Sequence, residues 1–317
     1  MERALITGIT GFVGSHLAEH LLSLGYEVYG TIRRRSRTDN IEHIINKIKL
    51  VETDIADAHS TLKFMEEVKP DYVFHLAAQS FVPTSWHAPA ETLTVNIIGT
   101  LNILEAARKS ANDIKIQIAG SSEEYGKVYP DEAPIKETNP LRPMSPYGVS
   151  KVAADKLALQ YNLSYGLKTI VTRAFNHTGP RRGDVFVSST FAKQIATIEK
   201  NKQEPVINHG NLDAIRDFTD VRDIVKAYEL SLTKCKFGEA YNICSGTGRK
   251  IQDVLNILIG LSKIKISTKL DPKRLRPSDV EILYGDYTKF REQTGWKPTI
   301  PFEKTLEDLL NYWREKI

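Results

Sequence analysis

The sequence predicts an α/β protein in which a doubly wound parallel sheet is followed by a smaller, mixed α/β C-terminal lobe. In the first half of the chain, short β-branched runs alternate with longer segments whose apolar residues have helical spacing. From about residue 176 this alternation gives way to loops, short strands and isolated helices. A length of 317 residues agrees with about two domains, at ~150 residues per domain.

Six apolar runs of strand length predict the sheet. Parallel strands are buried on both faces, so they form continuous apolar runs rather than alternating patterns. The predicted strands are residues 4–7, 27–32, 49–52, 72–76, 115–118 and 169–172, and the predicted helices are residues 13–24, 59–68, 91–110 and 148–165. In the first helix, Leu17, Leu21 and Leu24 form the apolar stripe, which predicts that His16 faces solvent.

The composition excludes several classes of protein. Apolar residues make up 41% and charged residues 26% of the chain, which excludes a disordered protein. No run approaches the ~18 apolar residues of a membrane-spanning helix, and we expect no signal peptide. Cys235 and Cys244 cannot build a disulfide framework and lack metal-site neighbours, so we expect a cytoplasmic protein without a metal. The net charge of +4 suits a phosphorylated small molecule and is too weak to indicate nucleic acid.

A glycine-rich turn joins the first predicted strand to the first helix, in the sequence Gly8-Ile-Thr-Gly-Phe-Val-Gly14. Glycines at this place allow a tight turn and a close approach of the backbone to a pyrophosphate, which the helix N-terminus then faces. The spacing is one residue wider at its first gap than the GxGxxG fingerprint. The turn predicts a Rossmann-type dinucleotide site, with cofactor-binding residues Gly8, Thr10, Gly11, Phe12, Val13 and Gly14.

Arginines follow the second predicted strand, where NAD-binding proteins place an acidic residue to hold the ribose. Guanidinium groups suit a 2′-phosphate, so the sequence favours NADP, with Arg33 as the first ligand and Arg34 as the second. The alternative is a solvated basic loop. Asp54 either accepts a hydrogen bond from adenine or caps the following segment. The remaining predicted cofactor contacts are Ile55, Leu76, Ala77 and Ala78.

Two further elements predict an active site. Ser121-Ser-Glu-Glu-Tyr125 follows a predicted strand, and Tyr147-Gly-Val-Ser-Lys151 begins a helix, where residues i and i+4 share a face. A Lys one turn from a Tyr stabilises the phenolate, so we expect Lys151 to lower the pKa of Tyr147 and make it a general acid–base. The Ser121 hydroxyl would hydrogen-bond the carbonyl or alkoxide oxygen of the substrate. The alternative is an exposed helix pair without a function.

The order of glycine turn, Ser121 and Tyr147-x-x-x-Lys151 resembles the extended short-chain dehydrogenase/reductase family over essentially the whole chain. Several stretches are similar to its GDP-mannose branch, which contains 4,6-dehydratases and 4-keto-6-deoxymannose reductases. Residues 5–11 and 180–187 are dehydratase-like, whereas residues 121–126, 141–151 and 216–223 are reductase-like. The resemblance implies an NADP-binding domain at residues 1–175, which carries the catalytic Ser121, Tyr147 and Lys151, and an interleaved nucleotide-sugar lobe at residues 176–317.

Glu123 bears on which reaction the resemblance implies. It falls where the dehydratases keep the carboxylate that removes the C5 proton, a base that simple ketone reduction does not need. Its alternative role is to orient the sugar or to bind water. We expect reduction of the C4 ketone of GDP-4-keto-6-deoxy-D-mannose, as in GDP-rhamnose synthesis, because the dehydratases are typically longer in the C-terminal lobe.

Other functions remain open on the sequence alone. A GDP-mannose 4,6-dehydratase, or a bifunctional enzyme with Glu123 as base, is the alternative, followed by a nucleotide-sugar epimerase. A non-catalytic NADP-sensing protein on the same fold is disfavoured, because Ser121, Tyr147 and Lys151 are all present.

The resemblance also implies residues that hold the sugar nucleotide and a residue that contacts the cofactor, His177. Arg216 and Arg276 would clamp the diphosphate. The dehydratases carry a basic pair where this chain has Ser188 and Ser189, so their grip on the substrate is altered here. The implied substrate-binding set is Ser122, Asn176, Val187, Lys193, Arg216, Arg276 and Asp279.

The remaining expectations concern support and assembly. His75 is predicted to be a packed core residue, and the resemblance implies that Asn96 supports the backbone near the active site. In the family, helices corresponding to residues 91–110 and 148–165 form a four-helix interface. We therefore expect a homodimer or a homotetramer of dimers, with a GDP-sugar as substrate and neither nucleic acid nor membrane as partner.

Overall fold

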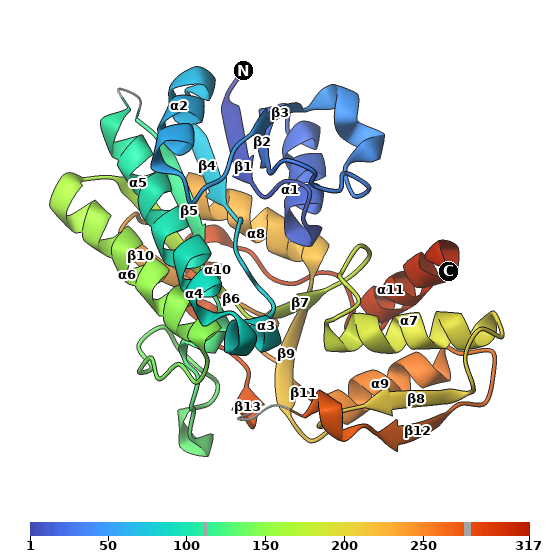
Figure 1. Cartoon of the computed structure of the whole chain (residues 1–317). Helices are drawn as coiled ribbons and strands as arrows, with labels where there is room; N and C mark the ends of the chain where they lie inside the picture. The colour runs from blue at the N-terminus through green and yellow to red at the C-terminus, as the bar shows by residue number, and fades with distance from the viewer. Residues whose placement is uncertain (111–112, 276–279) are drawn as a thin grey trace.

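The computed structural model describes residues 1–110, 113–275 and 280–317. All six predicted strands of the first half lie in one seven-stranded sheet, in which every pairing is parallel (Figure 1). In spatial order the strands are β10 (Glu239–Ile243), β6 (Lys168–Ala174), β5 (Lys115–Ala119), β4 (Tyr72–His75), β1 (Arg3–Thr7), β2 (Glu27–Ile32) and β3 (Lys49–Glu52). The predicted doubly wound α/β fold is confirmed.

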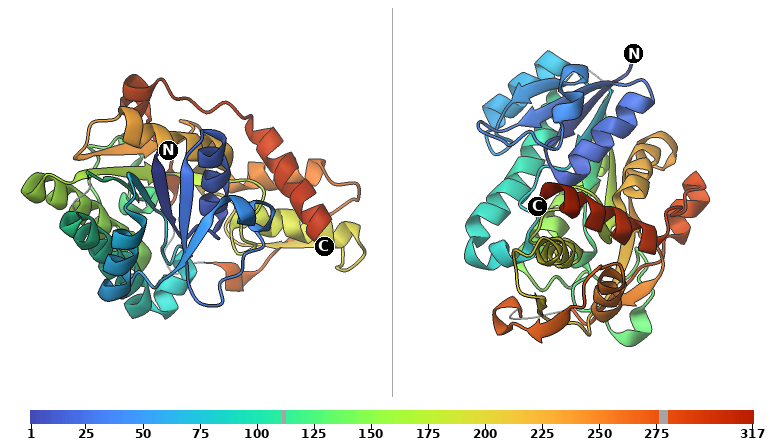
Figure 2. Two further views of the ribbon diagram at one scale, coloured as in Figure 1. Left: turned by 90° about the horizontal axis from the view of Figure 1, so that it is seen from above. Right: turned by 90° about the vertical axis from the view of Figure 1, so that its right-hand side faces the viewer.

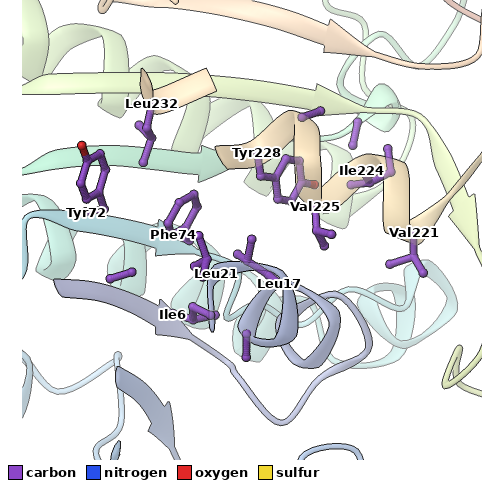
Figure 3. Packing of buried hydrophobic residues seen from close by; sticks show 14 of the residues in the cluster. Ile6, Leu17, Leu21, Tyr72, Phe74, Val221, Ile224, Val225, Tyr228 and Leu232 are labelled. Carbon is purple, nitrogen blue, oxygen red and sulfur yellow. The ribbon is translucent and has the colours of Figure 1, made fainter. Parts of the chain in front are cut away.

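Helices cover both faces of this sheet. One face packs against α2 (Ala58–Val68), α5 (Gly99–Lys109) and α6 (Pro146–Tyr165). The other face packs against α1 (Phe12–Ser23), α8 (Val221–Lys234) and α10 (Thr288–Thr294). Figure 3 shows the side chains of α1 and α8 meeting above β1 and β4, with Leu17, Leu21, Ile224 and Tyr228 among them. Burial on both faces explains the continuous apolar runs of the strands.

The first half of the sequence does not build this layered unit alone. Strand β10 and helix α8 both follow residue 176 in the sequence, yet β10 extends the sheet beside β6 and α8 packs on α1. The two parts are therefore interleaved, because the chain returns to the sheet after it has begun the second lobe.

The second lobe has its own small sheets and its own core. Strand β9 (Ile215–Asp220) pairs with β7 (Asn176–Thr178), β11 (Gly248–Lys250) and β13 (Ile282–Leu283), and β8 (Val206–His209) pairs with β12 (Ser267–Leu270). Helices α7 (Val187–Glu199), α9 (Ile251–Gly260) and α11 (Phe302–Lys316) enclose a separate apolar cluster. Figure 2 shows these helices gathered on one side of the molecule, away from α5 and α6. None of the helices in the described ranges has the length and apolarity to cross a membrane.

The prediction for the first helix was partly wrong. Leu17 and Leu21 are buried as expected, but Leu24 is 51% exposed and His16 is only 6% exposed. The segment after β7 covers this side of α1. The Nε2 atom of His16 lies 2.9 Å from the carbonyl oxygen of Pro180, and a guanidinium nitrogen of Arg181 lies 2.7 Å from its Nδ1. Helical spacing could not reveal this contact with a distant segment.

The single helix predicted over residues 91–110 is confirmed, but it contains a π-helical turn. It runs without interruption through α4 (Pro89–Leu93), the π-helical turn (Thr94–Ile98) and α5, and the short helix α3 (Val82–His87) precedes it. The side chain of Asn96 is buried in the π-helical turn, and at the start of α5 a Cβ atom on Gly99 would lie 2.7 Å from the Ile55 side chain. π-helical turns often occur at functional sites.

Candidate active site

A cavity of about 1090 Å³ opens where the carboxyl ends of the strands face the second lobe. The reversal of strand order between β1 and β4 places it at the usual ligand site of a doubly wound sheet. Most predicted site residues line it: Gly8, Thr10, Gly11, Phe12, Val13, Gly14, Arg33, Asp54, Ile55, Leu76, Ala77, Ala78, Ser121, Ser122, Glu123, Tyr147, Lys151, Asn176, His177, Val187 and Arg216. Arg34 and Lys193 do not, and Arg276 and Asp279 lie outside the described residues.

The glycine turn has the geometry that its sequence predicts. Gly8 has φ +73°, and a Cβ atom on it would lie 3.1 Å from the Cα of Ala77. A Cβ on Gly14 would lie 2.4 Å from the carbonyl oxygen of Gly8, so only glycine fits there. Gly11 precedes α1 and has no side-chain cap, which leaves the first N–H groups of the helix without a side-chain partner at this end.

The turn after β4 is held beside the glycine turn by Thr7. The Thr7 hydroxyl accepts hydrogen bonds from the backbone N–H groups of Leu76 and Ala77, each at 3.0 Å, and lies 2.9 Å from the Nδ1 of His75. Burial lowers the pKa of His75 to about 3, and the nearby Lys151 charge acts in the same direction. The prediction that His75 is a packed core residue is therefore confirmed.

The loop after β2 brings one arginine to the cavity. The Arg33 backbone N–H donates to the Ser36 hydroxyl at 3.0 Å, and both residues line the cavity, whereas Arg34 is exposed outside it. Asp54 caps the turn that follows it, which is one of its two predicted roles, but it does not cap helix α2. Its carboxylate accepts from the N–H of Ala56 at 2.9 Å, and Asp57 is the residue that caps α2.

Ser121 and Tyr147 meet at the floor of the cavity. Ser121 is the N-cap of a short 3₁₀ turn (Ser122–Glu124), and its hydroxyl accepts from the N–H of Glu123 at 3.2 Å. Tyr147 lies in the first turn of α6, and the nearby Ser121 side chain acts to lower its pKa. A Cβ on Gly148 would lie 2.7 Å from the Glu123 carbonyl oxygen, so this glycine lets the helix approach the catalytic loop closely.

The pKa of Tyr147 is raised overall, contrary to the net lowering predicted from Lys151. Burial is the largest cause, the Glu123 charge adds to the increase, and the Ser121 side chain opposes it. The Nζ of Lys151 donates to the carbonyl oxygen of Ala119 at 2.7 Å and lies 5.9 Å from the centre of the Tyr147 ring. Burial also lowers the pKa of Lys151 itself, to about 8.

Asn96 supports the cavity wall, as the resemblance implied. Its side-chain oxygen accepts from the N–H of Gln79 at 2.8 Å, and its amide donates to the Gln79 carbonyl oxygen at 3.0 Å and to the Ser150 hydroxyl at 2.9 Å. The residue thus ties the turn after β4 to the helix that carries Tyr147 and Lys151.

Arg182 is a cavity residue that sequence reasoning missed as a site residue. Its guanidinium lies 3.5 Å from the ring centre of Phe186 and 5.0 Å from that of Phe12, and burial lowers its pKa to about 10. Phe12 also stacks on His177, with ring centres 6.0 Å apart. Burial, together with the Arg182 charge, lowers the pKa of His177 to about 4. The dehydratase-like stretch 180–187 contains Arg182 and was the available signal.

Tyr228 on α8 and Phe81 after β4 also line the cavity without having been predicted. Tyr228 comes well after residue 176 in the sequence. The spacing of apolar residues in its helix predicts an apolar face, but not that this face reaches the cavity. Phe81 lies edge-on to Phe186, with ring centres 5.7 Å apart, so aromatic side chains from the two lobes meet across the cavity.

The predicted substrate residues divide into two groups. Arg216 is 7% exposed and lines the cavity, as do Lys273 and Arg274. Lys193 instead pairs with Asp184 at 2.6 Å and lies 5.3 Å from the Trp313 ring, away from the cavity lining. The sequence of α7 did not show whether Lys193 faces the cavity or forms an ion pair at the surface.

The serines that replace the dehydratases' basic pair have structural roles. Ser188 shares a hydrogen bond with Thr178 at 2.7 Å, while the Ser189 hydroxyl donates to the Arg182 carbonyl oxygen and accepts from the Trp313 indole N–H. Both side chains are buried at the start of α7.

Comparison with known proteins decides the family. The family model of GDP-mannose 4,6 dehydratase matches residues 5–309. This chain belongs to the GDP-mannose 4,6 dehydratase family. The predicted resemblance to the extended short-chain dehydrogenases/reductases and their GDP-mannose branch is thereby confirmed.

Relatives within the GDP-mannose 4,6 dehydratase family include both a reductase and dehydratases. The chain is 33% identical to GDP-6-deoxy-D-mannose reductase of Pseudomonas aeruginosa, over all of this chain and 98% of the relative. It is 39% identical to GDP-mannose 4,6 dehydratase 2 of Arabidopsis thaliana, over 99% of this chain and 88% of the relative.

Solved structures show the same fold. The RMD protein of P. aeruginosa, solved in complex with NADPH, has a TM-score of 0.86 and 31% identity, and the match covers 100% of both chains. UDP-glucose 4-epimerase of Thermus thermophilus, solved with NAD, has a TM-score of 0.88 and 29% identity, covering 99% of this chain and 100% of that chain. The fold therefore extends beyond GDP-sugar enzymes, and the reaction has to be argued from the site.

Proposed function

We propose that this protein is an NADP-dependent reductase that acts on the C4 ketone of GDP-4-keto-6-deoxy-D-mannose. The observation that carries the proposal is the meeting of Ser121 and Tyr147 at the floor of a cavity that also reaches the glycine turn and Arg216. A reductase relative that shares essentially the full length of both chains supports this specific reaction.

The residues present fit a dinucleotide phosphate cofactor. A Cβ atom on Gly14 would fill the space between the turn and α1, and Gly11 leaves the start of the helix uncapped by a side chain. These features suit a pyrophosphate, and Arg33 would hold the 2′-phosphate that distinguishes NADP from NAD. Bound NADPH would supply the hydride for the ketone carbon.

The protein's own residues would handle the oxygen and its proton. Ser121 would donate a hydrogen bond to the C4 oxygen, and Tyr147 would deliver a proton to that oxygen as it becomes an alkoxide. Lys151 holds a positive charge near Tyr147, which favours the phenolate that remains after proton transfer. Arg216 would bind the diphosphate through charge-assisted hydrogen bonds and fix the sugar over Tyr147.

Glu123 supports a second candidate function, the 4,6-dehydratase reaction. This carboxylate lines the cavity, and its charge raises the pKa of Tyr147. A base at that place could remove a proton from C5 and assist loss of water across C5 and C6. Two observations favour the reductase: the chain spans 98% of the reductase but 88% of the Arabidopsis dehydratase, and buried serines replace the dehydratases' basic pair.

A product assay separates the two functions. Purified protein is supplied either with GDP-mannose and no added NADPH, or with GDP-4-keto-6-deoxymannose and NADPH. A reductase consumes NADPH only in the second mixture. A 4-keto-6-deoxy product formed in the first mixture would overturn the proposal in favour of the dehydratase, and inactivity in both would favour an epimerase or another nucleotide.

We also propose a homodimer, or a tetramer of dimers, that pairs the outer face of α6 with that of the π-helical turn and α5. Val149 and Leu163, near the two ends of α6, are 46% and 84% exposed, and Ile98 in the π-helical turn is 42% exposed. Exposed apolar residues on neighbouring helices are typical of an interface. Light scattering should give at least twice the monomer mass, and Leu163→Glu should lower it. A monomeric wild type would contradict the dimer.

A reducing, cytoplasmic location fits this function. Cys235 and Cys244 are both buried as free thiols, and burial raises the pKa of Cys235 to about 12, so it would stay protonated. Fractionation of the native cells, with the protein found in the soluble fraction, tests this location.

A further inference from the structure

A buried charge cluster behind the catalytic loop takes no part in the proposed chemistry. The side chains of Glu124 and Asp155 are 0% exposed, and that of Arg173 is 4% exposed. The Arg173 Nε donates to the Asp155 carboxylate at 2.9 Å and lies 3.4 Å from Glu124 Oε2. The guanidinium also donates to the Tyr125 hydroxyl at 3.1 Å. Two carboxyl groups therefore share one guanidinium in the protein interior.

The cluster leaves two buried carboxyl oxygens without a hydrogen bond, Glu124 Oε2 and Asp155 Oδ1. Lys156 Nζ lies 3.2 Å from Asp155 Oδ1, but the lysine side chain is 57% exposed and its charge is screened by water. An ionised oxygen that is buried without a donor is costly. One proton held between the two carboxyl groups would supply a donor and remove the excess negative charge.

The electrostatic surroundings agree with a protonated Glu124. Burial and the neighbouring Asp155 charge raise the pKa of Glu124, whereas Arg173 and the backbone N–H of Ser121 act in the opposite direction. The other groups that interact with Glu124 are Lys151 from the same helix as Asp155, and Tyr147 and Tyr125. Among these groups, Asp155 is the carboxylate that can accept a hydrogen bond from a protonated Glu124.

Glu124 is also bonded to the catalytic loop. Its Oε1 accepts from the backbone N–H of Ser121 at 2.7 Å. The chain passes so close that a Cβ atom on Gly120 would lie 2.6 Å from that oxygen. Asp155 lies one helical turn beyond Lys151 on α6. The cluster thus joins the loop that carries Ser121 to the helix that carries Tyr147 and Lys151.

We propose that Glu124 is a neutral carboxylic acid that donates a hydrogen bond to Asp155, and that this pair positions Ser121 against Tyr147. Glu124 lies behind the loop rather than on the substrate side, so it is a positioning residue. The kinetic part of the proposal rests on the proposed function, whereas the protonation state of Glu124 does not.

Infrared spectroscopy of the whole protein at about pH 8 tests the protonation state, because carboxyl groups with ordinary pKa values are ionised there. The wild type should show the carbonyl band of a protonated carboxylic acid, and Glu124→Gln should lose it. Asp155→Asn should lose it too, since its amide can donate to an ionised Glu124. The matched control is Glu132→Gln, because Arg142 holds the pKa of Glu132 at about 2. A band that is absent from the wild type, or that survives in Glu124→Gln, overturns the proposal.

Kinetics on the substrate that the wild type turns over test the positioning role. Glu124→Gln keeps an acceptor for the Ser121 N–H and a donor for Asp155, so kcat should stay within about threefold. Glu124→Leu has similar volume but no hydrogen bond, so kcat should fall about 10–100-fold with little change in KM. A Glu124→Gln variant as slow as Glu124→Leu, or a fully active Glu124→Leu variant, contradicts the role. If no substrate is turned over, the proposed function has failed, and the infrared result still decides the protonation of Glu124.

Discussion

Lys151 donates a hydrogen bond from its Nζ to the carbonyl oxygen of Ala119 at 2.7 Å, which anchors the lysine to the end of strand β5. The ammonium group therefore acts on Tyr147 across a gap rather than by contact, at 5.9 Å from the ring centre. A buried ammonium with one backbone acceptor is only partly compensated for the loss of water, which explains why the pKa of Lys151 falls to about 8.

This relationship predicts an alkaline limit to activity. Because the pKa of Lys151 is lowered to about 8, the free enzyme loses this positive charge as the pH rises through that value. The charge favours the phenolate of Tyr147, so kcat/KM should decrease above about pH 8. In Lys151→Arg the group stays charged, and the decrease should move to higher pH even if the maximal rate is lower. An identical alkaline limb in both proteins would argue against the role of Lys151.

Arg33 and Arg34 allow a matched test of which arginine gives the preference for NADPH over NADH. Arg33 lines the cavity and Arg34 does not, although they are adjacent in the sequence. Loss of a charge-assisted bond to a 2′-phosphate should raise the Kd for NADPH by about 10–100-fold in Arg33→Ser, with little change for NADH. Arg34→Ser should change either Kd by less than about threefold. Fluorescence titration measures the Kd for NADPH and for NADH. Equal effects of the two substitutions would contradict the assignment of the 2′-phosphate contact to Arg33 alone.

Tyr147 and Glu123 should respond differently to substitution. Tyr147→Phe removes the proton donor and should lower kcat for the ketone about 10²–10⁴-fold. Glu123→Gln should keep ketone reduction within about fivefold. The control is Tyr165→Phe at the exposed end of α6, which should be fully active. Loss of ketone reduction in Glu123→Gln would assign the carboxylate a catalytic role.

Substitutions of Arg216 and of Lys193 should have different effects on the KM for the sugar nucleotide. Lys193 is paired with Asp184 outside the cavity lining, so Lys193→Ala should change KM for the sugar nucleotide by less than about twofold. Arg216→Lys keeps the charge but loses the planar fork, and should raise KM roughly tenfold. Steady-state kinetics with circular dichroism as a folding check measure both. A large effect of Lys193→Ala would place the diphosphate near α7 instead.

The sequence predicted the parts of the site that depend on local geometry. Two features are local in the sequence: the turn from Gly8 to Gly14 and the pair of Tyr147 and Lys151. The spacing of these residues therefore determines where they lie relative to one another. Contacts between distant segments were not accessible in this way. The burial of His16 depends on residues 180 and 181, and the approach of Tyr228 to the cavity depends on the return of the chain to the first sheet.

Electrostatic effects were the least predictable. The Tyr-x-x-x-Lys spacing correctly placed Lys151 near Tyr147, but the direction of the Tyr147 pKa shift depends on how completely the cavity floor is buried. In the same way, the sequence left open whether Asp54 caps the segment after β3, and the structure shows that Asp54 caps the turn there whereas Asp57 caps α2.

The most direct test of the proposed reaction follows one hydrogen atom. NADPH that carries deuterium at the transferred position of C4 is supplied with GDP-4-keto-6-deoxymannose, and the product is analysed by mass spectrometry and NMR. A reductase incorporates one deuterium per product, at C4 of the sugar. A sugar without deuterium and NADPH left unconsumed would contradict it. A parallel mixture with GDP-mannose that yields a 4-keto-6-deoxy sugar without deuterium would instead indicate a dehydratase, because a dehydratase returns the substrate's own hydrogen and leaves the cofactor unchanged.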